Sequence, residues 1–144
     1  MIAVRAARVE DAPRVAHLAT ELGYPAESAA ARRRLERLAE DPASHVLVAE
    51  IDGRTAAWLH VAEMHTLESE PCAEIVGLVV DAALRSTGVG AALVEAAIAW
   101  AAGRGLSEIR VRSNVVRERA HRFYERQGFR VLKTQRVFTR PTQR

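Results

Sequence analysis

The chain has 144 residues, which is enough for one domain with a hydrophobic core and short for two. Apolar residues make up 49% of it and charged residues 27%, and no apolar run approaches the roughly 20 residues of a membrane span. Charges near the N-terminus argue against a signal peptide, and the lone Cys72 excludes a disulfide framework. We therefore expect a single domain over residues 1–144, in the cytoplasm and without a membrane partner.

The net charge of +3 is unevenly distributed. Residues 110–144 contain eleven Lys or Arg but only two acids, Glu118 and Glu125. This pattern indicates either a solvated basic surface or a surface for an anionic ligand. No zinc finger, helix-turn-helix or RNA-binding motif accompanies it, so we expect no nucleic-acid partner. The five histidines are scattered and the usual metal-ligand spacings are missing, so we expect no metal.

The first half of the chain alternates between strand and helix patterns. Residues 2–9 alternate as a strand does. Asp11 and Pro13 are typical of a helix start, and they open a helix over residues 10–22. A second helix is predicted over residues 28–40. Two strands, 45–51 and 54–65, follow it and are joined by a hairpin turn at Asp52-Gly53.

The second half begins with a nearly continuous apolar strand, residues 73–81. Gly77 in its middle predicts a bulge or a close backbone approach. The remaining predicted elements are a helix over 89–104, a strand over 107–113, a helix over 116–128 and one or two closing strands within 129–140. This order predicts an α/β fold in which helices flank a mixed sheet.

The turn between strand 73–81 and helix 89–104 reads Arg85-Ser86-Thr87-Gly88-Val89-Gly90. A glycine-rich turn that opens a helix can bind phosphate through unpaired N–H groups and the helix dipole. A P-loop is excluded because no lysine follows Gly90. A dinucleotide-binding fingerprint fits poorly, because Leu93 replaces its third glycine and Glu108 opens the next strand instead of ending it.

Two stretches, "LVVDAALRSTGVGAALV" and "AHRFYERQGF", resemble the GCN5-related N-acetyltransferase (GNAT) superfamily. In that family a [QR]-x-x-G-x-[GA] loop binds the pyrophosphate of acetyl-CoA through backbone amides, and Arg85, Gly88 and Gly90 match its three defining positions. The second stretch matches the family's Tyr signature that ends in Gly-Phe. The resemblance spans nearly the whole chain and implies a mixed, mostly antiparallel sheet flanked by about four helices.

The resemblance implies acetyl-CoA as cosubstrate and a set of residues that bind it. The expected contacts are Leu78, Val79 and Val80 on the strand and Arg85, Ser86, Thr87, Gly88, Val89, Gly90 and Ala91 in the turn. The chain departs from the family by having Ala82 and Leu84 where a proline and an aromatic are frequent. It also has Arg117 where many relatives place an Asn that contacts the cofactor. We therefore expect both Asn114 and Arg117 among the residues that contact acetyl-CoA.

The implied reaction is direct transfer of the acetyl group to an amine. Tyr124 matches the tyrosine that resembling enzymes use as general acid toward the CoA sulfur; packing alone is the competing interpretation, because an apolar helical stripe adjoins it. Glu74 resembles the placement of a base that acts through water. His60, Glu63 and His65 are lesser base candidates, and Arg112 stands where other relatives place a base.

The acceptor is implied to be a primary amine of a small molecule or peptide. Tyr24, between the first two helices, is expected to line its site. The acidic loop that contains Glu63, Glu68, Glu70 and Glu74 either favours a cationic amine or is simply exposed. The resemblance makes a homodimer through the C-terminal strands plausible. A non-catalytic acyl-CoA-binding or regulatory module with the same fold remains the alternative.

Overall fold

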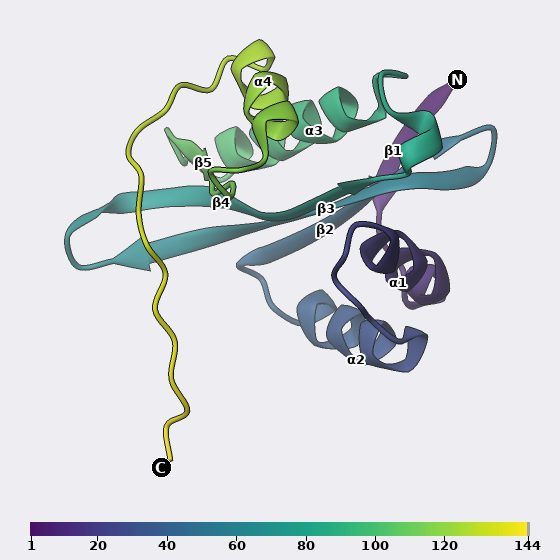
Figure 1. The fold of residues 1–144 in the computed structure, drawn as a ribbon, viewed down its shortest axis with the longest axis horizontal. Coiled ribbons are helices and arrows are strands. Elements are labelled where there is room, and N and C mark those ends of the chain that lie inside the picture. Colours follow the sequence, from purple (N-terminus) through teal and green to yellow (C-terminus); the bar gives the residue numbers. More distant parts are fainter. Residues whose placement is uncertain (144) are drawn as a thin grey trace. The chain divides into compact units, whose positions relative to one another are not determined.

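The structure is a computed structural model that describes residues 1–143, and Figure 1 shows its elements. In chain order these elements are β1 (Ile2–Ala6), η1 (Val9–Asp11), α1 (Ala12–Glu21), α2 (Ser28–Ala39), β2 (Ser44–Ile51), β3 (Arg54–Thr66), β4 (Ser69–Val80), η2 (Ala82–Leu84), α3 (Val89–Gly103), β5 (Ile109–Val111) and α4 (Glu118–Arg126). All predicted helices are present, and so are the five strands predicted up to residue 113. The strand predicted over residues 107–113 is shorter than expected, and β4 begins earlier than predicted.

The five strands form one sheet in the order β1-β2-β3-β4-β5. The first three pairings are antiparallel, and only β4 and β5 run parallel. The parallel pairing is short and joins Ala73, Glu74 and Ile75 to Ile109, Arg110 and Val111. The prediction of a mixed, mostly antiparallel sheet with about four helices is confirmed.

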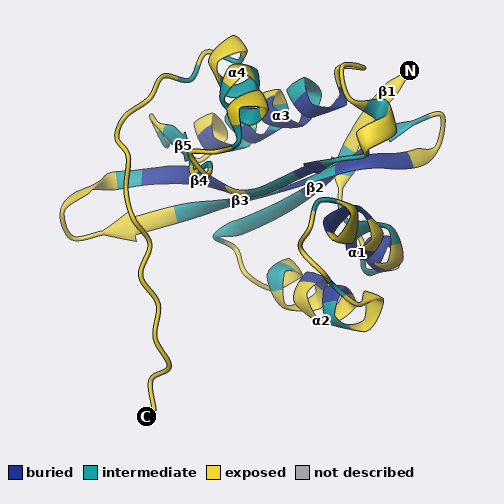
Figure 2. Ribbon diagram, viewed as in Figure 1, coloured by how far each residue is buried: buried dark blue, intermediate teal, exposed yellow. Residues whose placement is uncertain are grey.

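The chain separates into two compact units, Met1–Arg112 and Ser113–Arg144, which are described one at a time. In the first unit, α1 and α2 lie on one face of the sheet and α3 lies on the other (Figure 1). The central strands and the inward sides of these helices are buried (Figure 2). Leu59, Leu93 and Val94 are among the fully buried side chains of this core.

Strand register shows which residues lie on the face that α1 and α2 cover, here called the α1/α2 face. Val46 packs against the buried cluster that these two helices form. Because side chains alternate along a strand and directly paired residues share a face, His60, the partner of Val46, lies on the same face. Trp58 and Ala62 follow by alternation, and Glu74 follows because it pairs with Ala62.

A bulge interrupts β4 at Val76. His60 pairs with Gly77 and Val61 pairs with Ile75, so Val76 has no partner on β3. At Gly77, a Cβ atom would lie 2.9 Å from Cζ3 of Trp58, so only glycine leaves room for this indole. Of the two alternatives predicted from Gly77, a bulge is present, one residue earlier at Val76; the group that approaches Gly77 closely is a side chain, not a backbone.

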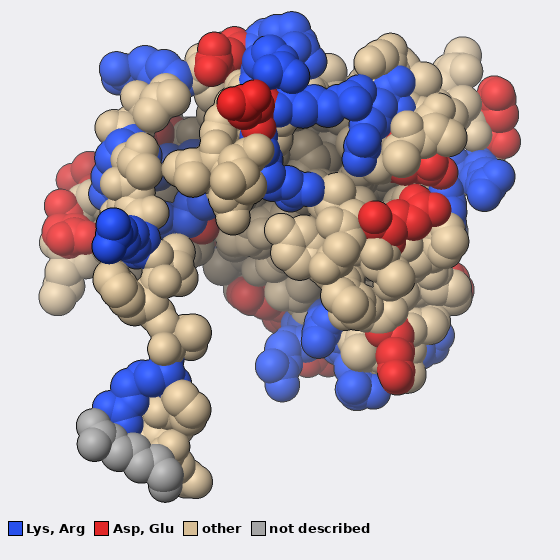
Figure 3. All heavy atoms as spheres, viewed as in Figure 1, with Lys and Arg blue, Asp and Glu red and all other residues tan. Residues whose placement is uncertain are grey.

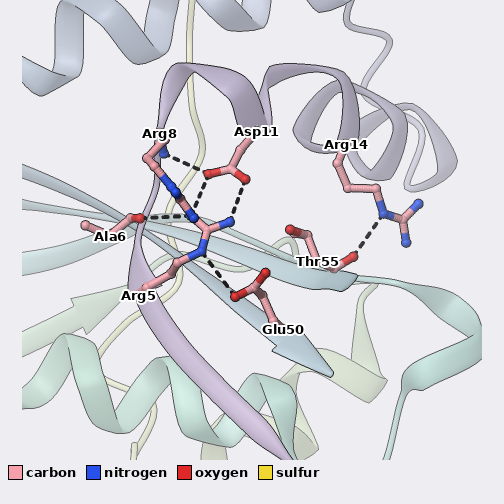
Figure 4. Close-up of polar contacts among 7 residues, drawn as sticks. All are labelled: Arg5, Ala6, Arg8, Asp11, Arg14, Glu50 and Thr55. Atoms are coloured by element: carbon pink, nitrogen blue, oxygen red, sulfur yellow. Dashed lines mark hydrogen bonds and ion pairs between the residues drawn. The ribbon is translucent and has the colours of Figure 1, made fainter. Parts of the chain in front are cut away.

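An ion-pair network ties β1 to the start of α1 (Figure 4). The Arg5 guanidinium donates to both carboxylate oxygens of Asp11, at 2.8 and 2.9 Å, and to Glu50 on β2 at 3.2 Å. Asp11 also accepts from the backbone N–H of Arg8 at 2.7 Å. The hydrogen bond from Arg5 holds the pKa of Asp11 below its ordinary value, although burial opposes this shift.

The second unit contains α4, whose end is a Schellman motif. The N–H of Phe129 donates to the carbonyl of Tyr124, and that of Gly128 donates to the carbonyl of Glu125, both at 3.0 Å. Gly128 has φ +93°, which the motif requires and glycine adopts without strain. The Tyr124 and Phe129 rings lie 5.6 Å apart, so the "Y-x-x-x-G-F" pattern is a helix stop with its hydrophobic contact.

The prediction of closing strands within residues 129–140 is wrong for the chain as described. Residues 129–143 contain no strand. Their apolar alternation suits an extended backbone, but a strand also needs a neighbour to accept its N–H groups, and none pairs with this segment in the described structure. Four of its apolar side chains are exposed, namely those of Val131, Leu132, Val137 and Phe138.

No helix in residues 1–143 is long and apolar enough to cross a membrane.

Candidate functional site

The strand β4 leaves part of its backbone unpaired beside β5. Its pairing with β5 ends at Ile75, whereas its pairing with β3 continues to Val80. Along Val76–Val80, the edge that faces away from β3 therefore has no strand partner within the described part of the chain. Leu78, Val79 and Val80 were predicted to bind the cofactor. Because the N–H of Asp81 donates to Ala56 on β3 and N–H groups alternate along a strand, those of Leu78 and Val80 face the open edge and that of Val79 faces β3. The main chain of Leu78 and Val80 can bind a ligand there while their side chains pack.

The chain then turns at Asp81, which caps η2. The N–H of Ala83 donates to Oδ1 of Asp81 at 3.0 Å. Oδ2 of the same carboxylate accepts from Nη2 of Arg14, on α1, at 2.7 Å. The hydrogen bond from Ala83, with that from Arg14 second, holds the pKa of Asp81 below its ordinary value.

The turn after η2 has an unusual backbone. Ser86 has φ +69° and Gly88 has φ +95°, so two residues within three lie in the left-handed region. Thr87 stabilises the turn because its hydroxyl donates to the carbonyl of Leu84 at 2.5 Å. Gly88 is the N-cap of α3 and, having no side chain, leaves the first turn of the helix uncapped.

This geometry creates an anion site made of backbone. The first N–H groups of an α-helix have no intrahelical acceptor, which here applies to the amides of Gly88, Val89, Gly90 and Ala91. The positive end of the helix dipole acts in the same place. Gly88 and the flanking Ser86 and Thr87 are exposed, so a phosphate can reach the amide of Gly88, whereas Val89 and Gly90 are buried. The Arg85 side chain is also exposed.

Glu74 lies at the parallel junction of β4 and β5, on the α1/α2 face. Its side chain is almost fully buried, and its carboxylate accepts from Nε of Arg112 at 3.2 Å. The two residues singled out at the base position, Glu74 and Arg112, therefore form an ion pair. With a rise of about 3.3 Å per residue, Leu78 lies roughly 13 Å further along β4.

The α1/α2 face carries Trp58, His60 and Glu74 around the bulge. Trp58 pairs with Val79, yet its ring reaches Gly77, so the indole lies over β4, the strand that carries the unpaired edge. Its Nε1 is buried without a hydrogen-bond partner among the described residues. His60 contacts the Ser44 hydroxyl at 3.3 Å, and burial lowers the pKa of this imidazole.

The other base candidates on β3 lie in a different environment. Glu63 binds both His65 and Arg104, the latter at 2.9 Å. These two bonds, with Arg104 the stronger influence, keep the pKa of Glu63 below its ordinary value. A carboxylate held by two donors is a poor proton acceptor, so the arrangement favours a structural role for Glu63.

In the second unit, Tyr124 is packed in an aromatic cluster. The Phe123 ring lies 5.1 Å from it and the Phe129 ring 5.6 Å, both edge to face. Burial raises the pKa of the Tyr124 hydroxyl above its ordinary value, while the charge of Arg117 opposes this shift. The phenol is therefore protonated at neutral pH, as a proton donor must be.

Asn114 and Arg117 organise the segment before α4. The Asn114 side-chain oxygen accepts from the N–H of Val116 at 3.1 Å, and its backbone carbonyl accepts from His121 at 2.9 Å. Arg117 is the N-cap of α4. The side-chain oxygen of Asn114 is thus engaged within its own loop, which limits its use as an acceptor for a ligand.

Tyr24 lies in the connection between α1 and α2, and 59% of its surface is exposed. Over α2, the arginines alternate with acidic side chains on the face drawn in Figure 3, and Arg32 pairs with Glu36.

Within residues 1–143, no group of three or more His, Cys, Asp or Glu is arranged to hold a metal ion.

A family model described as the acetyltransferase (GNAT) family matches residues 11–129. The chain belongs to the GNAT family. No curated protein matches its sequence.

Solved structures agree with the GNAT fold. One is described as a transcriptional regulator from Bacillus halodurans C-125, with 25% identity, a TM-score of 0.85 and coverage of 96% of this chain and 99% of that chain. An aminoglycoside 6'-N-acetyltransferase, AAC(6')-Ig from Acinetobacter haemolyticus, has 18% identity, a TM-score of 0.82 and coverage of 96% and 98%. AAC(6')-Iy in complex with the bisubstrate analogue CoA-S-monomethyl-acetylneamine has 16% identity, a TM-score of 0.87 and coverage of 98% and 99%.

Within this GNAT chain, sequence reasoning missed several interactions. The Asp81–Arg14 pair, the contact of Trp58 with Gly77 and the Glu74–Arg112 pair were not foreseen. An aspartate at the end of a strand typically caps a turn by accepting from the N–H two residues later. This pattern indicates the cap at Asp81 but not its pairing with Arg14. The other two contacts join different strands and leave no local pattern.

Proposed function

We propose that this chain is an N-acetyltransferase that transfers the acetyl group of acetyl-CoA to a primary amine in a ternary complex. The observation that carries the proposal is the uncapped first turn of α3 behind Gly88, whose backbone amides lack intrahelical acceptors and are proposed to bind the pyrophosphate. Arg85 adds an exposed positive charge beside it. Asn114 and Arg117 are proposed as further cofactor contacts.

The unpaired edge of β4 supports the second half of the donor site. Backbone N–H groups of Leu78 and Val80 would bind the pantetheine arm and the thioester oxygen, while Val79 between them holds the strand against β3. When bound, acetyl-CoA supplies an activated acyl carbon and a thiolate leaving group. Donors fixed by the sheet need no reorganisation as negative charge develops on the carbonyl oxygen.

The amine must be neutral to attack, and an alkylamine has a pKa of about 10. We propose that Glu74 accepts its proton through a water molecule, with Arg112 orienting the carboxylate. We propose that Tyr124 donates a proton to the departing sulfur, a role that its raised pKa supports. The GNAT family match covers both residues and spans the boundary between the two compact units, which supports a single catalytic domain.

The acceptor is proposed to be a cationic primary amine. The bisubstrate analogue bound to AAC(6')-Iy carries an aminoglycoside fragment, which makes polyamines the first class to test. Tyr24 is proposed to line the acceptor side. Nucleic acid is not proposed as a partner, because no motif for it accompanies the basic residues.

Calorimetric binding of acetyl-CoA, followed by CoA-thiol release with a panel of amines, tests this function. The panel should contain neamine, spermidine, free amino acids and a peptide with a free N-terminus. Binding with turnover on at least one amine supports the proposal. Binding without turnover on any of them favours the non-catalytic module, and no binding contradicts both.

Gly88→Ala provides the matched variant for this experiment. At φ +95° an alanine costs about 1–2 kcal/mol, so the turn relaxes and acetyl-CoA affinity falls roughly tenfold. Gly105→Ala places a similar strain at φ +77° beyond the C-terminal end of α3, at the opposite end of that helix from the turn. Gly105→Ala should lower stability and leave affinity unchanged; equal loss of affinity in both variants would contradict the assigned site.

A further inference from the structure

Asp81 lies at the base of the turn formed by residues 85–90, here called the cofactor turn, and makes several hydrogen bonds there. Its N–H donates to the carbonyl of Ala56 at 2.8 Å, and its own carbonyl accepts from the N–H of Leu84 at 2.9 Å. Its two carboxylate oxygens accept from Ala83 and Arg14. Asp81 therefore fixes where β4 ends and how η2 begins.

Arg14 connects this residue to two other elements. From α1, its Nε donates to the carbonyl of Thr55 on β3 at 2.9 Å, while its Nη2 holds Asp81 (Figure 4 shows the Thr55 contact). Both side chains of the ion pair are largely buried, with 20% and 16% of their surface exposed. One guanidinium thus joins α1, β3 and the end of β4.

A continuous series of hydrogen bonds leads from Asp81 to the amides that face the ligand. Asp81 holds the first residues of η2, and Leu84 at the end of η2 accepts from both the hydroxyl and the N–H of Thr87. Thr87 immediately precedes Gly88, the N-cap of α3. A shift of Asp81 therefore displaces the turn whose amides form the anion site.

We infer that Arg14 and Asp81 are a positioning pair for acetyl-CoA: Arg14, on a helix outside the cofactor turn, holds Asp81 so that the first-turn amides of α3 converge on the pyrophosphate. The inference rests on the proposed function and adds two residues to it. Neither side chain needs to touch the ligand. The pair also joins α1, which leads to Tyr24 and the acceptor side, to the donor side of the molecule.

Three variants test the pair. Arg14→Met removes the donors to both Thr55 and Asp81. Arg14→Lys keeps the positive charge, but its single ammonium group cannot bind both acceptors as the guanidinium does. Asp81→Asn keeps an acceptor for the N–H of Ala83 and removes the ion pair. Arg14→Met and Asp81→Asn should each raise the Kd and KM for acetyl-CoA about tenfold, with kcat at saturation within about twofold of wild type. The Kd and KM of Arg14→Lys for acetyl-CoA should lie between those of these two variants and those of wild type. The double variant should be no worse than the worse single one, because both remove the same interaction.

Arg5→Met is the matched control. Arg5 also joins the sheet to the start of α1 through a part-buried ion pair, to Asp11 at 2.8 Å, but it has no hydrogen bond to the cofactor turn. The Arg5→Met variant should lower Tm about as much as Arg14→Met does, and it should leave the Kd for acetyl-CoA unchanged. If both variants weaken binding equally, or if the Arg14 variants bind like wild type, the inference is overturned.

Hydrogen exchange separates this inference from the proposed function. Arg14→Met should exchange the amides of Ala83, Leu84 and Thr87 at least tenfold faster than wild type, whereas Arg5→Met should not. Unchanged protection of these amides overturns the inference even if acetyl-CoA binds. If wild type binds no acetyl-CoA, the proposed function fails, and faster exchange in Arg14→Met then supports a structural pair without a cofactor role.

Discussion

Single residues in the proposed site divide into those that act through the backbone and those that act through a side chain. Gly88 contributes a conformation and an amide, and Leu78 and Val80 contribute main-chain groups at a strand edge. Tyr124 and Glu74 are the positions where the side chain itself is proposed to react. Substitutions at the two kinds of position should therefore have different effects.

Tyr124→Phe should cut turnover by about 10²-fold or more with little change in acetyl-CoA affinity, because it removes the proton donor but keeps the ring against Phe123 and Phe129. Since burial raises the pKa of Tyr124, any loss of rate from this group should appear only at a higher pH than for an ordinary tyrosine. Steady-state rates and calorimetry give the two measurements. Unaffected turnover would show that Tyr124 only packs.

Glu74→Gln should lower kcat by about 10²-fold and remove the acidic limb of the pH–rate profile, because the amide cannot accept a proton. Glu95→Gln, an exposed acid on α3, should leave the profile unchanged. A variant at Glu74 that keeps the wild-type acidic limb would eliminate this residue as the base. His60 would then be the next candidate, since it lies on the same face of the sheet.

At the scale of elements, the bulge in β4 and the end of its pairing with β5 occur within two residues of each other. The extra residue, Val76, follows Ile75, where the β5 pairing stops. The same stretch accommodates the Trp58 ring over Gly77. The shape of β4 here thus depends on one glycine that faces one indole.

Gly77→Ala should destabilise the fold by about 1–3 kcal/mol, because its Cβ would lie 2.9 Å from Cζ3 and 3.1 Å from Cη2 of Trp58. Urea unfolding measures this cost, and the Trp58→Leu background should remove most of it. Gly103→Ala, in α3 with open space around it, should instead raise stability by about 0.5–1 kcal/mol. Equal cost of Gly77→Ala in both backgrounds would contradict the contact.

Elements that follow local rules could be predicted from the sequence, and contacts between distant elements could not. The Asp52-Gly53 hairpin, the glycine turn and the stop of α4 each depend on a few consecutive residues. Arg14 and Asp81 are far apart in the chain, and nothing near either residue indicates the other. The prediction of closing strands was wrong for the same reason, because an alternating pattern in residues 129–140 does not specify a neighbouring strand to pair with.

At the scale of the whole molecule, the C-terminal segment has apolar side chains and no strand partner within the described chain. Val137 and Phe138 are 91% and 86% exposed. Adjacent exposed apolar side chains can mark a protein–protein contact. The family resemblance points to a homodimer, and we propose that it forms through this C-terminal segment.

Light scattering after gel filtration should give the mass of a dimer for wild type and that of a monomer for the Val137→Lys/Phe138→Lys double variant. The reason is that two lysines cannot be buried between copies without a large desolvation cost. Exposed substitutions on α2, such as Arg33→Glu, should leave the mass unchanged. A monomeric wild type would contradict the proposal.

The backbone character of the turn at Gly88 has a consequence for how this protein can change. Every residue except proline brings the same N–H group, so substitutions other than proline within the first turn of α3 leave in place the groups that are proposed to face a phosphate. A compound directed at these amides would meet a target whose chemistry is nearly invariant under mutation. Escape from it would have to come from residues that set the shape of the turn, with Gly88, Asp81 and Arg14 foremost among them.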